Sequence, residues 1–355
     1  MLRSARRPLV CLHYGIGDVI MQLPVLESLK AYIPDAAITL LGAQPALELF
    51  DDDRRWRSVQ SVQAWGLRHW GDGGDSDIRA AVAAWVERSR FDIILDVSHA
   101  VHAVKEVLWQ LHWNILDTGT YLPTYDMDGV QAIKHSVARK WELPVSVNLQ
   151  PRIHLGQHRL QFADDYALRH LNGGKPPIAI SALASSALKR WPPGKLAQTA
   201  EALSSCFDLP VMIFAGPQAR MASRVAHHLK RPPVNVGPLH LLDTAALLSR
   251  CALLICNDTG LMHMGAAVGT PVVAVFGPTD PSIYLPPTAS CKAVGSTISC
   301  PHRKKGVFGP SACLVKGHCL IGTHSCIDDN AVASVLEAAM GLLNKSSKGV
   351  AWENA

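Results

Sequence analysis

The sequence predicts an α/β protein built from two Rossmann-like domains, each with a parallel sheet. Three observations lead to this prediction. Short apolar runs typical of buried strands alternate with stretches of helical apolar spacing in both halves of the chain. A Gly-Gly-Lys-Pro-Pro break at residues 173–177 separates the two halves. The length of 355 residues also exceeds what one hydrophobic core usually organises.

The first half begins with an apolar run at 8–13 that predicts a strand, followed by helical spacing over 18–31. Because strands that alternate with helices are joined by right-handed crossovers, the sheet is expected to be parallel. We assign residues 1–174 to this N-terminal domain. Its further expected elements are strands at 37–42 and 91–98 and a helix over 101–113.

The second half repeats the alternation, and we assign residues 175–330 to it. A closing helix at 328–343 and a loose tail are expected to complete the chain, so residues 331–355 form a third segment. The expected strands are 178–183, 210–216, 252–258 and 271–277, and the expected helices are 194–204, 218–229, 242–249 and 260–268.

Composition and charge narrow the classes of function. Hydrophobic residues make up 48% of the chain and charged residues 18%, which is typical of a globular protein. The chain has a basic start, but the apolar stretch after it is broken by His13 and Asp18 and lacks a small-residue cleavage site, so we expect no signal peptide. No apolar stretch is long enough to span a bilayer. We therefore expect a cytoplasmic protein without a transmembrane segment. The net charge of +5 favours nucleotides, phosphorylated sugars or an anionic membrane face, and the scattered basic residues predict no nucleic-acid partner.

The first motif is "YGIGDVIMQLPVLESLK" at 14–30, where two glycines and Asp18 stand between a strand and a helix. Asp18 can cap the helix or act as a catalytic carboxylate, and the motif alone leaves both roles open. A dinucleotide fingerprint would need a third glycine where Ile20 stands, and its partner acid is only loosely matched by Asp35. A nicotinamide-dependent enzyme is therefore the weaker interpretation.

Two further motifs lie where strands of the second half end. In "CNDTGLMHMGAAVGTPVVAVFGPTDP" at 256–281, Asp258 ends a strand, Thr259 and Gly260 begin a helix, and His263 follows one turn later. A helix start with free amides and a hydroxyl is a seat for phosphate. In "SALASSALKRWPPGKL" at 181–196, a loop of small residues presents Lys189, which can meet a diphosphate.

Together these motifs resemble glycosyltransferase family 9, the ADP-heptose:lipopolysaccharide heptosyltransferase group. "NDTGLMHMGAAVGTPVVAVFGPTDP" is the most specific part of the resemblance, "GIGDVIMQLPVLESLKAYIPDAAITLL" is similar to the family's first strand, turn and helix, and "ALKRWPPGKL" is similar to its lysine-tryptophan-proline segment. The resemblance implies a GT-B fold, with two Rossmann-like domains whose parallel sheets face each other across a cleft. It also implies an N-terminal acceptor-side domain and a C-terminal domain that binds the sugar nucleotide.

The resemblance assigns a role to each motif residue. It implies that Asp18 is the catalytic base and that Lys189 binds the donor phosphates and assists catalysis. The donor nucleotide is implied to contact Asp258, Thr259 and Gly260, followed by His263. Ser185 matches a hydroxyl position that contacts phosphate, and Asp243 matches an acid that faces the donor ribose.

The implied activity is inverting transfer of heptose from ADP-heptose to a lipopolysaccharide-core or related acceptor, with no metal required for catalysis. A lipid-linked or glycan acceptor would place the enzyme at the inner membrane face, peripheral to the membrane. Two alternatives stay open: transfer to a protein hydroxyl or another glycan, and a binding module that holds a nucleotide sugar without turnover.

The C-terminal region contains four cysteines within a loop-rich stretch, Cys300, Cys313, Cys319 and Cys326. Thiols in a reducing compartment serve more often as metal ligands than as disulfides, so a structural zinc or iron site is one expectation. The C-x-x-C pairs typical of zinc sites are missing, and structural thiols are the other expectation. Four other cysteines lie in apolar runs and are expected in the core: Cys11, Cys206, Cys251 and Cys256.

Overall fold

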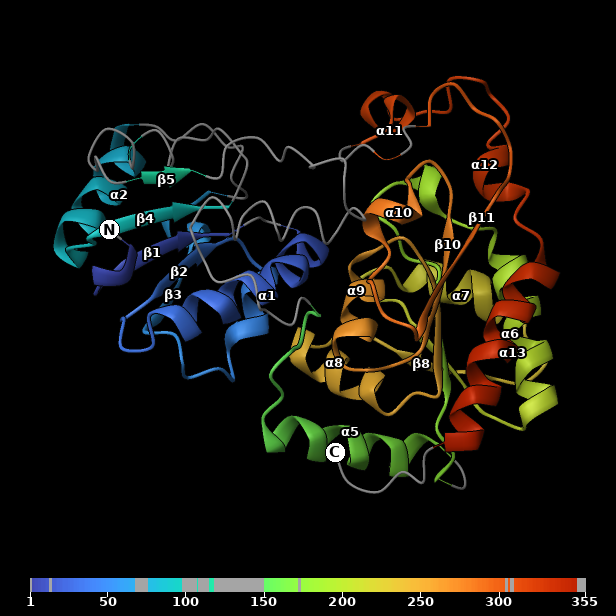
Figure 1. Ribbon diagram of the computed structural model, residues 1–355. Coiled ribbons are helices and arrows are strands. Elements are labelled where there is room, and N and C mark those ends of the chain that lie inside the picture. Colours follow the sequence, from blue (N-terminus) through green and yellow to red (C-terminus); the bar gives the residue numbers. More distant parts are fainter. Residues whose placement is uncertain are drawn as a thin grey trace. The chain divides into compact units, whose positions relative to one another are not determined.

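The computed structural model divides the chain into two compact units (Figure 1). Among the described residues, those up to His154 belong to the first unit and those from Leu155 onward belong to the second. Each unit is an α/β structure with one all-parallel sheet, as the sequence predicts. The structure describes residues 2–12, 15–67, 76–97, 107, 115–117, 150–171, 174–303, 306 and 310–349.

The first unit contains a five-stranded parallel sheet in the order β3-β2-β1-β4-β5. Strand β1 lies at its centre and pairs with β2 on one side and β4 on the other. Every residue of β1, β2 and β4 is buried, including the polar Thr39 and Asp96 at strand ends, and the other residues of these strands are mostly apolar. The strands are β1 Pro8–Cys11, β2 Thr39–Gly42, β3 Ser58–Ser61, β4 Ile93–Asp96 and β5 Ile115–Asp117, and the helices are α1 Ile16–Tyr32 and α2 Ser76–Ser89.

Helix α1 follows β1 directly and is buried along most of its length. Its Gln22 side chain donates a hydrogen bond to the carbonyl of Val97, just after β4, over 3.0 Å. This bond fixes the middle of α1 against the end of the neighbouring strand. The start of the helix is therefore held where β1 and β4 end.

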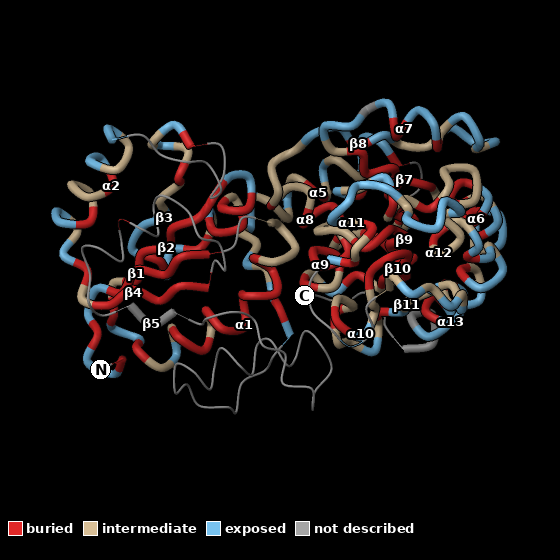
Figure 2. Tube along the Cα trace, turned by 90° about the horizontal axis from the view of Figure 1, so that it is seen from above, coloured by how far each residue is buried: buried red, intermediate tan, exposed pale blue. Residues whose placement is uncertain are grey.

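The second unit contains a six-stranded parallel sheet in the order β11-β10-β9-β6-β7-β8. Strands β6 and β9 pair at the centre, in a register that places Ser181 beside Cys256. The four inner strands are buried throughout, as Figure 2 shows in red. The strands are β6 Ile178–Ser181, β7 Val211–Phe214, β8 Val234–Val236, β9 Leu253–Asn257, β10 Val272–Phe276 and β11 Cys291–Gly295.

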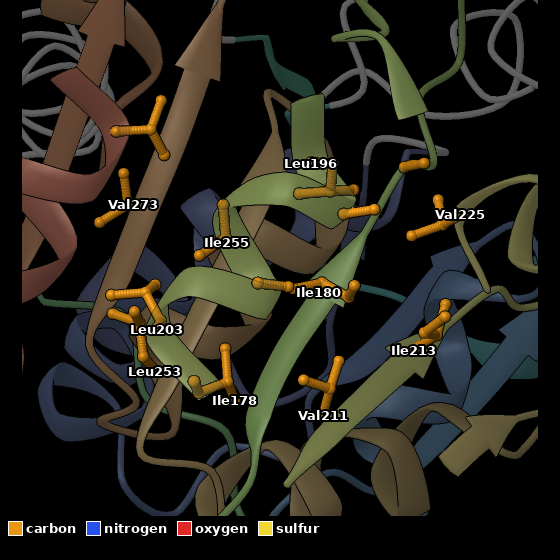
Figure 3. Close-up of a cluster of buried hydrophobic side chains, with 14 of the residues drawn as sticks. Ile178, Ile180, Leu196, Leu203, Val211, Ile213, Val225, Leu253, Ile255 and Val273 are labelled. Atoms are coloured by element: carbon orange, nitrogen blue, oxygen red, sulfur yellow. The ribbon is translucent and has the colours of Figure 1, made fainter. Parts of the chain in front are cut away.

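Helices cover both faces of this second sheet. Helices α6, α7 and α13 pack their apolar side chains against the sheet in one continuous core, part of which Figure 3 shows around Ile180, Ile213 and Ile255. Helices α8 and α9 pack together, α9 contacts β9 and β10, and α5 packs on α8. The helices of this unit are α5 Gln157–His170, α6 Pro193–Phe207, α7 Ala219–Ala226, α8 Leu241–Ser249, α9 Gly260–Ala267, α10 Pro281–Tyr284, α11 Ala312–Lys316, α12 Ser325–Asp328 and α13 Val332–Gly349.

The division between the units differs from the expected boundary at residue 175 by one helix. Helix α5 belongs to the second unit because ion pairs tie it to α8 and its end: Arg159 to Asp243 over 2.9 Å, and Arg250 to Asp164 over 2.6 Å. The closing helix also runs further than expected, to Gly349, so part of the expected tail is helical. Residues 350–355 and the expected helix at 101–113, apart from Val107, lie outside the described residues.

Candidate active site

The strand order reverses at one point in each sheet, and the connections that follow the two strands at this point run in opposite directions. In the second unit this point lies between β6 and β9, and in the first between β1 and β4. Ligands of open α/β sheets bind at the carboxyl ends of the strands at such a point. The loop carrying Lys189 follows β6, and Asp258 and Thr259 follow β9. The two donor motifs of the sequence therefore meet at the expected place in the second unit.

An ion pair joins the two motifs. The Lys189 ammonium lies 2.7 Å from Oδ2 of Asp258, and both side chains are largely buried. The Thr279 hydroxyl donates to the same oxygen over 2.8 Å. Thr279 follows the end of β10, so three neighbouring loops converge on one carboxylate. Asp258 therefore orients Lys189 rather than pointing freely into solvent.

Thr259 occupies the position just before α9, but its side chain does not cap the helix. The Thr259 hydroxyl is buried and has no hydrogen-bond partner in the structure. A buried hydroxyl without a partner carries a free-energy cost of about 1–3 kcal/mol, which a ligand oxygen would relieve. The start of α9 at Gly260 adds backbone N–H donors and the positive end of the helix dipole.

Helix α9 can lie this close to the sheet because it contains Gly265. A Cβ atom at this position would come within 2.8 Å of the Leu254 side chain on β9 and 3.3 Å of Val272 on β10. Any larger residue here would push the helix away from the sheet. Gly265 therefore helps to fix the distance between the start of α9 and the ends of the strands.

Asn257, the last residue of β9, holds the lysine loop in place. Its side-chain oxygen accepts a hydrogen bond from the Trp191 backbone N–H over 2.9 Å, and its amide donates to the Leu183 carbonyl over 3.0 Å. The buried Trp191 ring in turn donates from Nε1 to the Asn330 carbonyl over 3.1 Å. Lys189 therefore stands on a loop anchored at both ends.

Sequence reasoning missed Asn257 and Thr279. The signal for Asn257 was a polar side chain that ends an apolar strand, immediately before the predicted Asp258. Thr279 lies in the loop three residues after the end of β10, and its role became visible only through its contact with Asp258.

The other three residues predicted to contact the donor lie in different surroundings. Ser185 is exposed on the loop after β6, and the neighbouring Ser186 accepts a hydrogen bond from the Leu188 N–H over 3.2 Å. His263 is buried within α9. Asp243 pairs with Arg159 of α5, so its carboxylate is already engaged in the structure. The donor roles of these residues stay predictions.

Asp18 lies in the first unit, in the first turn of α1, which begins where the strand order of that sheet reverses. Gly15 occupies the N-cap position, so of the two roles left open for Asp18, that of N-cap is wrong. Gly15 has an ordinary φ of −80°, and the turn therefore does not depend on a left-handed glycine there. Asp18 is the third residue of the helix and is half-buried, and its negative charge interacts favourably with the positive end of the helix dipole.

The four predicted cysteine ligands line a single cavity of about 10 Å³ in the second unit. Ser311 also lines it, and the Ser311 hydroxyl is buried without a hydrogen-bond partner. The Leu320 N–H donates to the Cys313 sulfur over 3.5 Å. As they stand, no three Cys, His, Asp or Glu side chains of the described residues have the spacing to hold an ion. The cavity lining comprises Cys300, Cys313, Cys319, Cys326, Pro278, Ile298, His302, Arg303, Ser311, Ile321 and Ser325.

The thiols of this segment differ in acidity. The backbone N–H of His324, joined by those of the turn before it, lowers the pKa of the Cys319 thiol. Burial raises the pKa of the Cys326 thiol to about 11. Of the cysteines expected in the core, three are buried, but Cys206 is exposed on α6 and that expectation is wrong.

The second unit thus presents a buried lysine, an unpartnered hydroxyl and a helix start at the carboxyl ends of adjacent parallel strands. A lysine, a hydroxyl and a helix start are groups that bind phosphate in proteins. Two α/β units, each with one all-parallel sheet, are the architecture of the GT-B class of glycosyltransferases.

Comparison with known proteins gives the family. The sequence model of glycosyltransferase family 9 (heptosyltransferase) matches residues 122–307, more than half of the chain. The protein belongs to this family and is a glycosyltransferase.

Relatives and a solved structure agree with this assignment. The chain is 24% identical over 341 residues to lipooligosaccharide heptosyltransferase 2 of Campylobacter jejuni, covering 93% of this chain and 96% of the relative. It is 36% identical over 110 residues to the enzyme of the same name from Haemophilus influenzae, but this match spans 28% of the chain and 30% of that relative. The structure of E. coli ADP-heptose lipopolysaccharide heptosyltransferase II has the same fold, with a TM-score of 0.70, 17% identity, and coverage of 96% of this chain and 99% of the other. Together the relatives support heptosyl transfer to lipopolysaccharide core.

Proposed function

We propose that this protein transfers heptose, with inversion, from ADP-heptose to an acceptor of the lipopolysaccharide core, without a catalytic metal. The observation that carries the proposal is the seat after β6 and β9. There, Lys189 is held by Asp258 beside the unpartnered hydroxyl of Thr259 at the start of α9.

The donor diphosphate would lie on this seat. Its oxygens would accept hydrogen bonds from the Thr259 hydroxyl and from the first amides of α9, beginning at Gly260. Lys189 would be shared between Asp258 and the diphosphate, which places a cation beside the group that departs. Ser185 would add a hydroxyl from the exposed loop after β6, and His263 would complete the donor side.

Asp18 would act as the general base in the first unit. It takes the proton of the acceptor hydroxyl while the hydroxyl oxygen bonds to the anomeric carbon. The bond from that carbon to the diphosphate breaks, and its electron pair leaves with the phosphate oxygen next to Lys189. Because the acceptor attacks opposite to the leaving group, the anomeric configuration is inverted. One carboxylate suffices for this reaction, unlike the pair needed for glycoside hydrolysis.

The acceptor is proposed to be lipid-linked and to be reached at the inner membrane face. Within the described part of the chain, every helix is too short or too polar to cross a bilayer. A protein hydroxyl or another glycan is the alternative acceptor, and mass spectrometry of reaction products with each acceptor distinguishes them.

The donor assignment is tested by thermal unfolding with different sugar nucleotides. ADP-heptose at 100 times its Kd is expected to stabilise the protein by about 2.7 kcal/mol, and UDP- and GDP-sugars at equal concentration by much less. Thr259→Val should weaken the ADP-heptose effect, whereas Thr288→Val, in the loop before β11, should not. Equal stabilisation by all three nucleotides would contradict the donor assignment.

We also propose that the four cysteines around one cavity hold a structural metal ion, zinc or iron. Support comes from their convergence from separate parts of the loop and from the unpartnered Ser311 hydroxyl beside them. Cys300, Cys313, Cys319 and Cys326 would supply a tetrathiolate set, for which the sulfurs would have to move closer together. The ion would stabilise the loop and would take no part in transfer.

Elemental analysis of freshly purified protein tests this second proposal. About one equivalent of zinc or iron per chain is expected, and Cys313→Ser should lose it together with several kcal/mol of stability. Cys206→Ser, at the exposed cysteine on α6, should keep both. A wild-type protein that carries no metal after anaerobic purification, and whose Tm is unchanged by a chelator, would contradict the proposal.

A further inference from the structure

The basic residues are scattered along the chain, but their excess over acidic residues falls in one segment. Residues 281–327 contain five lysines and arginines and no aspartate or glutamate, which leaves 29 basic and 29 acidic residues in the rest of the chain. The whole net charge of +5 thus falls on this segment. Its basic residues are Lys292, Arg303, Lys304, Lys305 and Lys316.

The same segment carries an exposed apolar group. Of the six large hydrophobic side chains exposed in the described residues, three lie within seven residues: Val315 is 68% exposed, Ile321 41% and Leu320 37%. Lys316 and His318, between them, are also exposed. We call residues 315–321 the apolar-basic loop.

This loop is a defined structure and not a loose excursion. Helix α11 ends at Lys316, and Gly317 closes it with a left-handed φ of +75°. The chain then turns back, so that the Leu320 N–H reaches the Cys313 sulfur of α11 over 3.5 Å. A second turn joins the Gly322 N–H to the Cys319 carbonyl over 3.2 Å. These bonds hold Leu320 and Ile321 beside the helix that presents Val315.

We propose that the apolar-basic loop docks the protein on an anionic lipid surface. Val315, Leu320 and Ile321 would enter the interfacial region of the leaflet, as the apolar side of membrane-surface segments does. Lys316, which is exposed between these apolar side chains, would meet the anionic headgroups, where one charge near the surface contributes about 1 kcal/mol. Neither set alone is sufficient for stable binding, but the two reinforce each other.

Charge decides between a lipid surface and a second copy of the chain. A two-fold interface brings the same patch of both subunits together. Because residues 281–327 contain no carboxylate, such pairing would place like charges against each other. An anionic leaflet supplies the missing negative charge. The preference for lipid over an acidic protein rests on the proposed function, since a lipid-linked acceptor requires access to a membrane.

Vesicle flotation tests the proposal with the full-length protein. The protein is expected to bind vesicles of phosphatidylcholine that contain about 30% phosphatidylglycerol. Binding should weaken steeply as the salt concentration is raised, and it should be weak on vesicles of phosphatidylcholine alone. The triple variant Val315→Ser, Leu320→Ser, Ile321→Ser should reduce partitioning about tenfold or more. Leu168→Ser, which changes the exposed leucine on α5, is the matched control and should bind as wild type.

A second experiment tests the contribution of charge. Lys316→Glu replaces a positive by a negative charge and should weaken binding to anionic vesicles at least about tenfold. Lys230→Glu, an exposed lysine outside the segment, makes the same change in net charge and should have a much smaller effect. ADP-heptose should stabilise every variant as it does wild type. This shows that the variants fold, and it separates loss of docking from failure of the proposed donor site.

Three results would overturn the proposal. The first is equal binding to neutral and anionic vesicles, and the second is loss of binding with the Leu168 or Lys230 control as large as with the loop variants. The third is a wild-type oligomer in sedimentation equilibrium that the triple variant dissociates, without any change in vesicle binding, because the loop would then be an interface between copies of this chain.

Discussion

Replacing Asp18 by asparagine is expected to lower kcat for transfer by about 100- to 10,000-fold, with the affinity for ADP-heptose unchanged within about twofold. Asparagine keeps the size of the side chain but cannot accept the acceptor's proton. Asp18 lies in the first unit, whereas the donor seat lies in the second, so donor binding should be spared. The measurements are single-turnover transfer and donor titration by calorimetry.

The same substitution should barely change stability. Asp18 is not the N-cap of α1, and its favourable interaction with the helix dipole accounts for about 0.3–1 kcal/mol. Asp77→Asn is the matched control, because Asp77 is the acid in the first turn of α2 in the same unit. It should lose similarly little stability and keep full transfer. Transfer by Asp18→Asn at about a tenth of the wild-type rate or more would exclude Asp18 as the base.

Replacing Lys189 by methionine should impair both transfer and stability. Removing a cation beside the leaving diphosphate is expected to reduce kcat by about 100- to 1,000-fold. The substitution also leaves Asp258 buried without its ion-pair partner, which costs about 3–5 kcal/mol of folding free energy. Denaturant unfolding and steady-state kinetics measure the two effects on the same preparation.

The double variant Lys189→Met, Asp258→Asn separates these effects. Neutralising Asp258 removes the unpaired charge, while the asparagine can still accept the Thr279 hydrogen bond, so most of the stability should return. Transfer should not return, because the cation is still missing. If the double variant regains transfer along with stability, Lys189 acts only as a structural partner of Asp258 and its proposed role with the diphosphate is wrong.

Much of the fold could be predicted because buried strands are recognisable in the sequence. β1, β6, β9 and β10 are buried on both faces and appear in the sequence as short apolar runs between turn residues. The helices that follow them have apolar spacing because they pack on a sheet. The strands at the sheet edges were missed, because they have no such apolar run in the sequence: β3, β5, β8 and β11.

The candidate site shows the same division. Lys189, Asp258, Thr259 and Asp18 could be found because glycines, polar residues and apolar runs around them mark strand ends and helix starts. That Lys189 and Asp258 form a buried pair could not be read from two motifs about seventy residues apart. It depends on β6 and β9 being neighbours, which is a property of strand order.

By itself the sequence determined the α/β class, the number of parallel-sheet units and the loops that carry the chemistry, since these follow from local patterns of apolar and turn residues. Only the tertiary structure decided that Asn257 anchors the lysine loop, that Thr279 shares the Asp258 carboxylate, and that the four cysteines of the C-terminal region line one cavity. The physical reason is that hydrogen bonds and ion pairs between loops depend on which strands lie side by side, and local sequence patterns do not determine the strand order.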